Sequence, residues 1–200
     1  MVHLCGRPLS NRGRCILGRE TAIQKMYWNE DDWLVTAHGE PTPLVDVPPP
    51  KLISHEFPRE PIRDDFTEPK LNVNFQWLRS PFAHELFSLL ERPGHLRLYG
   101  RESIGSMFQQ SLVARRQQAF CYTAVTSIDF NPEDFQQMAG LVCYYNGSKF
   151  HYLFVSHDEG LGKYLRVMSS NPDQVQLDAF TAPVQIAKDL LCELHRDRSD

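Results

Sequence analysis

The stretch Ala119-Phe-Cys-Tyr-Thr-Ala-Val-Thr-Ser-Ile-Asp-Phe130 carries the longest regular alternation in this chain of 200 residues. Every second position belongs to a largely apolar set: Phe120, Tyr122, Ala124, Thr126, Ile128 and Phe130. The intervening positions form a more polar set: Cys121, Thr123, Val125, Ser127 and Asp129. Because successive side chains of a β-strand point to opposite faces of its sheet, the pattern predicts a strand whose apolar set faces the core. We expect this strand to be the central one of its domain.

The sequence around this strand also alternates and is interrupted by turn-forming residues. Lys149–Ser156 follows the dipeptide Asn146-Gly147, and Lys163–Ser169 follows Glu159-Gly-Leu-Gly162. A shorter alternating segment, His95–Tyr99, has leucines at alternate positions. No long amphipathic helical pattern lies between these segments. Short strands at this spacing predict an antiparallel β-sandwich or barrel.

The N-terminal part has a different texture. Thr21–Trp28 alternates imperfectly and leads through Asn29-Glu-Asp-Asp32 to Trp33-Leu-Val35, which predicts a β-hairpin. Seven prolines then stand between Gly39 and Pro61. Because proline has no backbone N–H, this stretch cannot complete a ladder of hydrogen bonds and favours extended geometry. We therefore place a domain boundary there.

This reading divides the chain into four parts. Residues 1–40 contain the hairpin, 41–61 form a proline-rich linker, 62–187 form the sandwich and 188–200 form a tail. The last six residues, His195-Arg-Asp-Arg-Ser-Asp200, carry five ionisable groups, so we expect them to be solvated.

Two tracts near the start, His3-Leu-Cys-Gly-Arg-Pro8 and Arg14-Cys-Ile-Leu-Gly-Arg-Glu-Thr-Ala-Ile-Gln-Lys25, resemble the last blade of the five-bladed propeller in family 43 glycoside hydrolases of the β-xylosidase-like branch. Four later tracts resemble the concanavalin-A-like β-sandwich that follows the propeller in that branch. They are Asn74-Phe-Gln-Trp-Leu-Arg79, Arg92-Pro-Gly-His-Leu-Arg-Leu-Tyr-Gly100, Gln110-Ser-Leu-Val-Ala-Arg-Arg-Gln117 and Gln136-Gln-Met-Ala-Gly-Leu-Val-Cys-Tyr-Tyr-Asn146. The resemblance runs from about His3 to about Val184.

The resemblance implies an all-β chain: an antiparallel concanavalin-A-like jelly roll preceded by a hairpin remnant of the propeller. After Pro183-Val-Gln-Ile-Ala187 the sequence departs from the family, so we expect an incomplete sandwich with unpaired strand edges. The catalytic carboxylates of the family lie upstream of every residue in this chain. The resemblance therefore implies the C-terminal part of an inverting glycosidase that acts on xylo- or arabino-oligosaccharides, inactive by itself. The alternatives are a free-standing carbohydrate-binding module and a module that complements a separately encoded propeller.

Carboxylate doublets are candidates for a catalytic pair, because glycosidic cleavage normally uses two carboxyl groups that flank the bond. The doublets are Asp31-Asp32, Asp64-Asp65, Glu133-Asp134 and Asp158-Glu159. Each lies in or beside a predicted turn, where acidic residues make local hydrogen bonds, and adjacent strand residues point to opposite faces. We therefore expect no catalytic residue in this chain.

Arg19 is the single residue to which the resemblance assigns a functional role. In the whole enzyme the arginine of the Gly18-Arg-Glu-Thr21 motif projects into the sugar pocket. A guanidinium suits that place, since its rigid fork of donors matches sugar hydroxyls and carboxylates.

Other candidate sites are weaker. His151 and His157 are six residues apart and fall on one face of a strand, but neither has the carboxylate or cysteine neighbours of a metal site. Seven aromatic residues either stack on sugar rings or, more commonly for this spacing, belong to the core: Trp77, Phe120, Tyr144, Tyr145, Phe150, Tyr152 and Phe154. We expect no metal ion and no cofactor.

Composition excludes some partners. The net charge is −4, and the sequence contains no broad basic region, only the short pair Arg115-Arg116. Both observations argue against a nucleic-acid partner. No run approaches the roughly 18 apolar residues of a membrane span. The five cysteines show no Cys-x-x-Cys spacing, so we expect reduced thiols and a cytoplasmic location. Cys121 and Cys143 lie in apolar strand patterns and are expected in the core.

Overall fold

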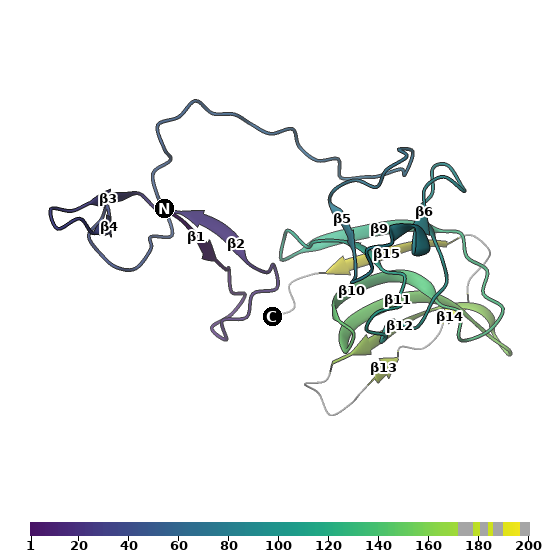
Figure 1. Cartoon of the computed structure of the whole chain (residues 1–200). Coiled ribbons are helices and arrows are strands. Elements are labelled where there is room, and N and C mark those ends of the chain that lie inside the picture. The colour runs from purple at the N-terminus through teal and green to yellow at the C-terminus, as the bar shows by residue number, and fades with distance from the viewer. Residues whose placement is uncertain (172–177, 181–183, 186–189, 197–200) are drawn as a thin grey trace. The chain divides into compact units, whose positions relative to one another are not determined.

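The computed structural model describes residues 1–171, 178–180, 184–185 and 190–196 (Figure 1). The chain divides into two compact units. The first comprises residues 1–64 together with 116–120, and the second comprises 65–115 together with residues from 121 onward. The four-part division at 40/41, 61/62 and 187/188 stays a prediction.

The first unit contains two antiparallel strand pairs. Strand β1 (Val2–Cys5) pairs with β2 (Glu20–Ile23), and β3 (Met26–Trp28) pairs with β4 (Leu34–Thr36). The predicted hairpin is confirmed in β3–β4. Its turn is held by the side chain of Asn29, whose Oδ1 accepts hydrogen bonds from the backbone N–H groups of Asp31 (3.1 Å) and Trp33 (2.7 Å).

The expected continuous strand from Thr21 to Trp28 is wrong, because β2 and β3 end and begin on either side of Gln24. The Gln24 side chain is buried and takes part in a reciprocal pair of hydrogen bonds with the backbone of Leu44. Nε2 donates to the carbonyl oxygen at 2.7 Å, and Oε1 accepts from the N–H at 3.3 Å. This local anchoring separates two strands that have different partners.

The second unit is built on a five-stranded antiparallel sheet. It contains β10 (Ala139–Asn146), β11 (Lys149–Asp158), β12 (Gly162–Ser170), β13 (Asp178–Phe180) and β14 (Val184–Gln185). The order is β10-β11-β12-β13, and β14 also pairs with β12. The turns predicted at Asn146-Gly147 and Glu159–Gly162 connect β10 to β11 and β11 to β12.

Three shorter pairs complete this unit. They are β9 (Tyr122–Ile128) with β15 (Leu190–Arg196), β5 (Phe75–Trp77) with β8 (Val113–Arg115), and β6 (Phe87–Ser88) with β7 (Arg97–Leu98). Strand β15 lies within residues 188–200, which the sequence predicts to be a tail. In the part of the chain that the structure describes, the single helical segment is a 3-10 turn, Ala83–Glu85. The chain is therefore all-β, as predicted, and none of its described helices is long enough to cross a membrane.

The predicted orientation of β9 is confirmed. Tyr122, Ala124, Thr126 and Ile128 are half-buried, whereas the residues between them are exposed. Ile128 and Phe130 pack against Leu153 and Val155 of β11. The even-numbered side chains of β9 thus close one face of the large sheet.

The expectation that β9 is the central strand is wrong. Within the described residues β9 pairs with β15 alone, whereas β11 has β10 on one side and β12 on the other. Residues 153–156 of β11 are all buried, so both faces of this strand are covered. Alternation identifies a strand with one open face, and a central strand covered on both faces loses that signature.

Two smaller expectations also fail. Cys121 is exposed, as are the odd-numbered residues of β9, which follows it directly. Cys143 on β10 is half-buried and shares a 2.9 Å hydrogen bond with the Tyr122 hydroxyl. The segment His95–Tyr99 shortens to the two-residue strand β7, in which Leu98 is exposed.

Candidate functional site

Arg19 lies in the first unit, in the loop that leads into β2, and its side chain is exposed. The loop turns at Gly18, whose φ of +79° favours glycine. The Cys15 thiol donates to the Gly18 carbonyl oxygen at 3.0 Å and so ties the loop together. Among the described residues Arg19 has no ion-pair partner, so its guanidinium is available to a ligand.

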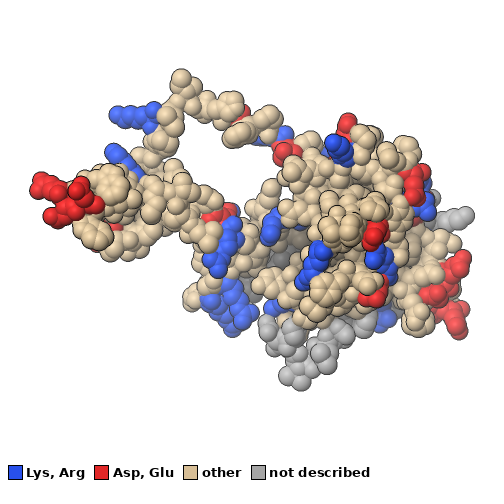
Figure 2. All heavy atoms as spheres, viewed as in Figure 1, with Lys and Arg blue, Asp and Glu red and all other residues tan. Residues whose placement is uncertain are grey.

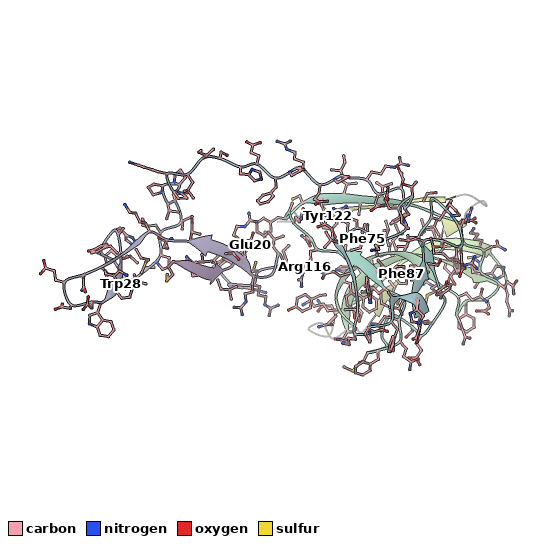
Figure 3. The ribbon with its side chains drawn as sticks, turned by 45° about the horizontal axis from the view of Figure 1, so that its top comes forward. Glu20, Trp28, Phe75, Phe87, Arg116 and Tyr122 are labelled. Carbon is pink, nitrogen blue, oxygen red and sulfur yellow. The ribbon has the colours of Figure 1, made fainter. Side chains whose placement is uncertain are left out.

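The neighbouring residue Glu20 is committed to a bidentate pair with Arg7. Arg7 Nε and Nη2 donate to the two carboxylate oxygens at 2.7 and 2.8 Å. The hydrogen bond from Arg7 lowers the pKa of Glu20, so this carboxylate is held as an anion. Arg7 also lies over the Phe120 ring, 5.8 Å from its centroid. The guanidinium of Arg116 lies beside Gly18. Glu20 and Arg116 are both labelled in Figure 3.

The strand pairs of the first unit carry exposed apolar side chains. In β1 and β2 the exposed positions are Val2, Leu4, Thr21 and Ile23. In the β3–β4 hairpin, Trp28 is 68% exposed and Trp33 is 71% exposed. Figure 3 shows Trp28 projecting away from the hairpin. We call this set of exposed residues (Val2, Leu4, Ile23, Trp28 and Trp33) the hairpin face.

The four carboxylate doublets belong to different elements of the two units. Figure 2 shows acidic side chains gathered at the far end of the β3–β4 hairpin, where Asp31 and Asp32 lie in the turn. Glu133-Asp134 and Asp158-Glu159 are exposed and lie in or beside separate turns of the second unit. Asp64 ends the main segment of the first unit, and Asp65 begins the second.

Asp158 shows why such groups are poor acid catalysts. Its Oδ1 accepts hydrogen bonds from the backbone N–H groups of Gly160 (2.9 Å) and Leu161 (3.0 Å). These bonds lower the pKa of the carboxyl, whereas a proton donor needs a raised pKa. Asp134 makes the same kind of local contact, accepting from the N–H of Gln136 at 2.8 Å. Both residues organise turns.

In the described part of the chain no group of three or more His, Cys, Asp or Glu side chains comes together that could hold a metal ion. His151 and His157 both lie on β11, and His151 Nδ1 is 2.8 Å from the Ser169 hydroxyl on β12.

The candidate aromatic residues divide between core and surface. Phe150 and Phe154 are buried, and Tyr145 is exposed. Trp77 is half-buried and packs edge-on against Phe87, with centroids 5.3 Å apart, while its indole N–H donates to the Ser80 carbonyl at 2.9 Å. Phe120, Tyr144 and Tyr152 are half-buried. Figure 3 labels Phe87 on β6 and Phe75 on β5.

Gln110 is the residue that sequence reasoning missed. It is 5% exposed, and its Oε1 has no hydrogen-bond partner. Its Nε2 is 3.5 Å from the Tyr144 hydroxyl. The spacing of Gln110 to the buried Leu112 matches a strand face, but a glutamine in such a pattern is normally taken for a surface residue.

Comparison with known proteins matches residues 63–197 to the family described as "Beta xylosidase C-terminal Concanavalin A-like domain". The β-xylosidase of Bacillus subtilis is 46% identical over 178 residues, covering 84% of this chain and 33% of that protein. Xylosidase/arabinosidase 43B of Humicola insolens is 50% identical over 162 residues, covering 80% and 29%. The crystal structure of xylan β-1,4-xylosidase from Bacillus halodurans covers 98% of this chain and 38% of its own, with a TM-score of 0.91 and 43% identity. The chain thus spans about one third of the length of the curated relatives it matches.

Proposed function

Since the chain belongs to the family of β-xylosidase C-terminal concanavalin A-like domains, we propose that it serves as the C-terminal, non-catalytic part of a glycoside hydrolase for xylo- or arabino-oligosaccharides. The names of the relatives support this substrate class. The observation that carries the proposal is the match itself: high identity along most of this chain, and to only about one third of each relative.

The local contacts of the carboxylate groups support a non-catalytic role. In the described residues Asp31-Asp32, Glu133-Asp134 and Asp158-Glu159 lie in or beside turns far apart in the sequence, and the pKa of Asp158 is lowered. An inverting glycosidase needs two carboxyl groups facing one bond, one of them with a raised pKa. Hydrolysis therefore requires carboxylates from another part of the hydrolase, on the same chain or on a separate one.

The hairpin face is the surface through which we propose that the chain joins this catalytic part. Burying exposed tryptophan and aliphatic side chains is favourable, at roughly 25 cal/mol per Å² of apolar area. The matched Bacillus halodurans chain contains nearly all of this chain, first unit included, and continues for more than half its length beyond the match. That additional part is the proposed occupant of the hairpin face.

Arg19 is proposed to reach the sugar pocket of the assembled enzyme. It is exposed and unpartnered among the described residues, and Gly18 and Cys15 define the loop that carries it. A cytoplasmic location is also part of the proposal, supported by the free state of the four described cysteines.

Complementation tests the proposed function. The full chain is co-expressed with the part of the Bacillus subtilis β-xylosidase that precedes the matched region, and hydrolysis of an aryl xyloside is measured. We expect no turnover from this chain alone and clear turnover from the pair. Turnover by the chain alone, or a front part that is equally active with and without the chain, contradicts the proposal.

The role of Arg19 is tested in the same pair. Loss of a charged hydrogen-bond donor to the sugar costs about 1.5–3 kcal/mol, so Arg19→Ala should lower kcat/KM roughly ten- to hundred-fold. Arg12→Ala is the matched control, since Arg12 is also exposed in the loop between β1 and β2. Equal effects of the two variants would remove Arg19 from the pocket.

A further inference from the structure

We propose that Arg7 is a positioning residue for Arg19: it binds Glu20, the next residue after Arg19, and is itself held against the ring of Phe120. Its effect on the reaction rests on the proposed function, in which Arg19 reaches the sugar pocket of the assembled enzyme. The restraint on the loop that carries Arg19 belongs to the first unit alone and can be measured in the isolated chain.

Arg19 lies just outside the β1–β2 ladder. The antiparallel register ends with Cys5 opposite Glu20, so the paired part of β2 begins one residue after Arg19. The residue before it, Gly18, has the left-handed φ of +79° that glycine adopts without strain. Backbone outside a ladder is more mobile than the strands it joins. The direction of the Arg19 side chain therefore depends on the contacts of the two residues that flank it.

Glu20 is held by the planar fork of Arg7. Arg7 Nε and Nη2 donate to the two carboxylate oxygens at 2.7 and 2.8 Å. Two parallel hydrogen bonds fix the orientation of both groups, which a single contact does not do. The Arg7 side chain is 59% exposed, and an exposed ion pair adds little to stability. The pair therefore restrains geometry more than it stabilises the fold.

The segment 116–120 supports both neighbours of Arg19. This segment belongs to the first unit. The half-buried ring of Phe120 lies 5.8 Å from the Arg7 guanidinium carbon, a distance suited to a cation–π contact. Arg116, labelled in Figure 3, places Nη1 3.9 Å from the position of a Cβ atom on Gly18. One short segment thus contacts Gly18 directly and reaches Glu20 through Arg7.

The Arg97–Glu91 pair in the second unit provides a matched control. The Arg97 side chain is 57% exposed, close to the value for Arg7, and its Nε lies 3.0 Å from a Glu91 carboxylate oxygen. Arg97 lies on β7, outside the unit that carries Arg19. Replacing Arg97 therefore removes an arginine from a similarly exposed ion pair without touching the Arg19 loop.

Backbone dynamics of the isolated full chain test the restraint. 15N relaxation gives the order parameter of the Arg19 amide, and Arg7→Leu should lower it from about 0.85 to about 0.6. Phe120→Leu should lower it as well, whereas Phe120→Tyr, which keeps the ring, should not. Arg97→Leu should leave it at the parent value. An Arg19 order parameter that Arg7→Leu leaves unchanged overturns the proposal.

A double-mutant cycle in the complemented enzyme tests whether Arg7 acts through Arg19. With an aryl xyloside, Arg7→Leu should lower kcat/KM about three- to ten-fold, and Arg97→Leu should not. In an Arg19→Ala background Arg7→Leu should have almost no further effect, because the side chain that it positions is gone. A merely structural role would lower kcat/KM by the same factor in both backgrounds, and that result overturns the proposal.

Failure of the proposed function gives a different result from failure of the positioning role. If the pair shows no turnover, or if Arg19→Ala is no worse than Arg12→Ala, Arg19 has no role in the pocket and Arg7 loses its role in the reaction with it. If Arg19→Ala lowers kcat/KM and Arg7→Leu does not, the proposed function stands and only the positioning role is overturned.

Discussion

At Gly140 the backbone of β10 runs so close to β11 that a side chain has no room. A Cβ atom there would lie 1.9 Å from the Leu153 carbonyl oxygen and 2.8 Å from the Phe154 Cα. Gly140→Ala should therefore force the two strands apart and destabilise the unit by about 1–3 kcal/mol or more, the usual range for overpacking. Gly100→Ala is the control, because nothing lies within 4 Å of a Cβ at that position. Urea unfolding of both variants measures the difference, and equal midpoints would contradict the close approach.

The half-buried and exposed faces of β9 give a second prediction about single residues. Ile128 packs against the cluster of Leu153 and Val155, whereas Ser127 is exposed. Ile128→Ala should cost about 2 kcal/mol, at the lower end of the range for buried isoleucine because the residue is half-buried. Ser127→Ala should cost far less. A larger loss from Ser127→Ala in denaturant melts would show that the two faces are reversed.

Single residues also show where sequence reasoning succeeds and fails. Ile128 and Ser127 could be assigned to opposite faces because alternation is a local property of the chain. Gln24 and Gln110 could not be placed, since the burial of a polar side chain depends on distant partners such as Leu44 and Tyr144. Cys121 was expected in the core because cysteine is usually buried, although its odd-numbered position lies on the exposed face of the strand. The role of Arg19 stays a prediction, because its ligand would come from outside the described contacts.

At the scale of elements, the β11–β12 hairpin depends on the charge of Asp158. Hydrogen bonds from the Gly160 and Leu161 N–H groups lower the pKa of this carboxyl below its ordinary value of 3.8. The charged form therefore stabilises the folded hairpin above that value, and the contribution is lost as the pH falls through the lower, folded-state pKa. Asp158→Ala should reduce stability at neutral pH.

The difference between parent and Asp158→Ala should shrink in acid, below pH 3.8. Urea melts of both proteins across the acid range measure it. Glu159→Ala provides the comparison, because Glu159 lies in the same turn and is also exposed. A difference between parent and Asp158→Ala that is constant with pH would mean that the carboxylate charge does not act on the turn.

Elements differ in how far their pairing follows from sequence. The turns Asn146-Gly147 and Glu159–Gly162 predicted the β10–β11 and β11–β12 hairpins, because a short turn determines which strands are neighbours. The pairing of β9 with β15 had no such local signal. β11 was not predicted as the central strand for a different reason, since a strand covered on both faces lacks the alternation that β9 shows.

For the whole molecule, the two units should differ in local stability. The first unit consists of two-stranded pairs with exposed apolar side chains, while the second contains a five-stranded sheet with buried residues along β11. Hydrogen exchange detected by mass spectrometry should therefore show β3–β4 exchanging faster than β10–β12 in the isolated chain. Equal protection of the two regions would contradict this view. Adding the front part of the hydrolase should slow exchange in β3–β4.

The order of strands along the sheet has a kinetic consequence. β10, β11 and β12 are neighbours in the sheet and successive in sequence, so their contacts close short loops at low entropic cost. The pairing of β9 with β15 closes a much longer loop, because the β10–β11–β12 meander and the two short strands after it lie between them in the chain. We expect the meander to form early and to act as the template on which β9 and β15 dock. The unit would then refold at a rate limited by that late, long-range closure, and substitutions in β9 would change the unfolding rate more than substitutions in β11.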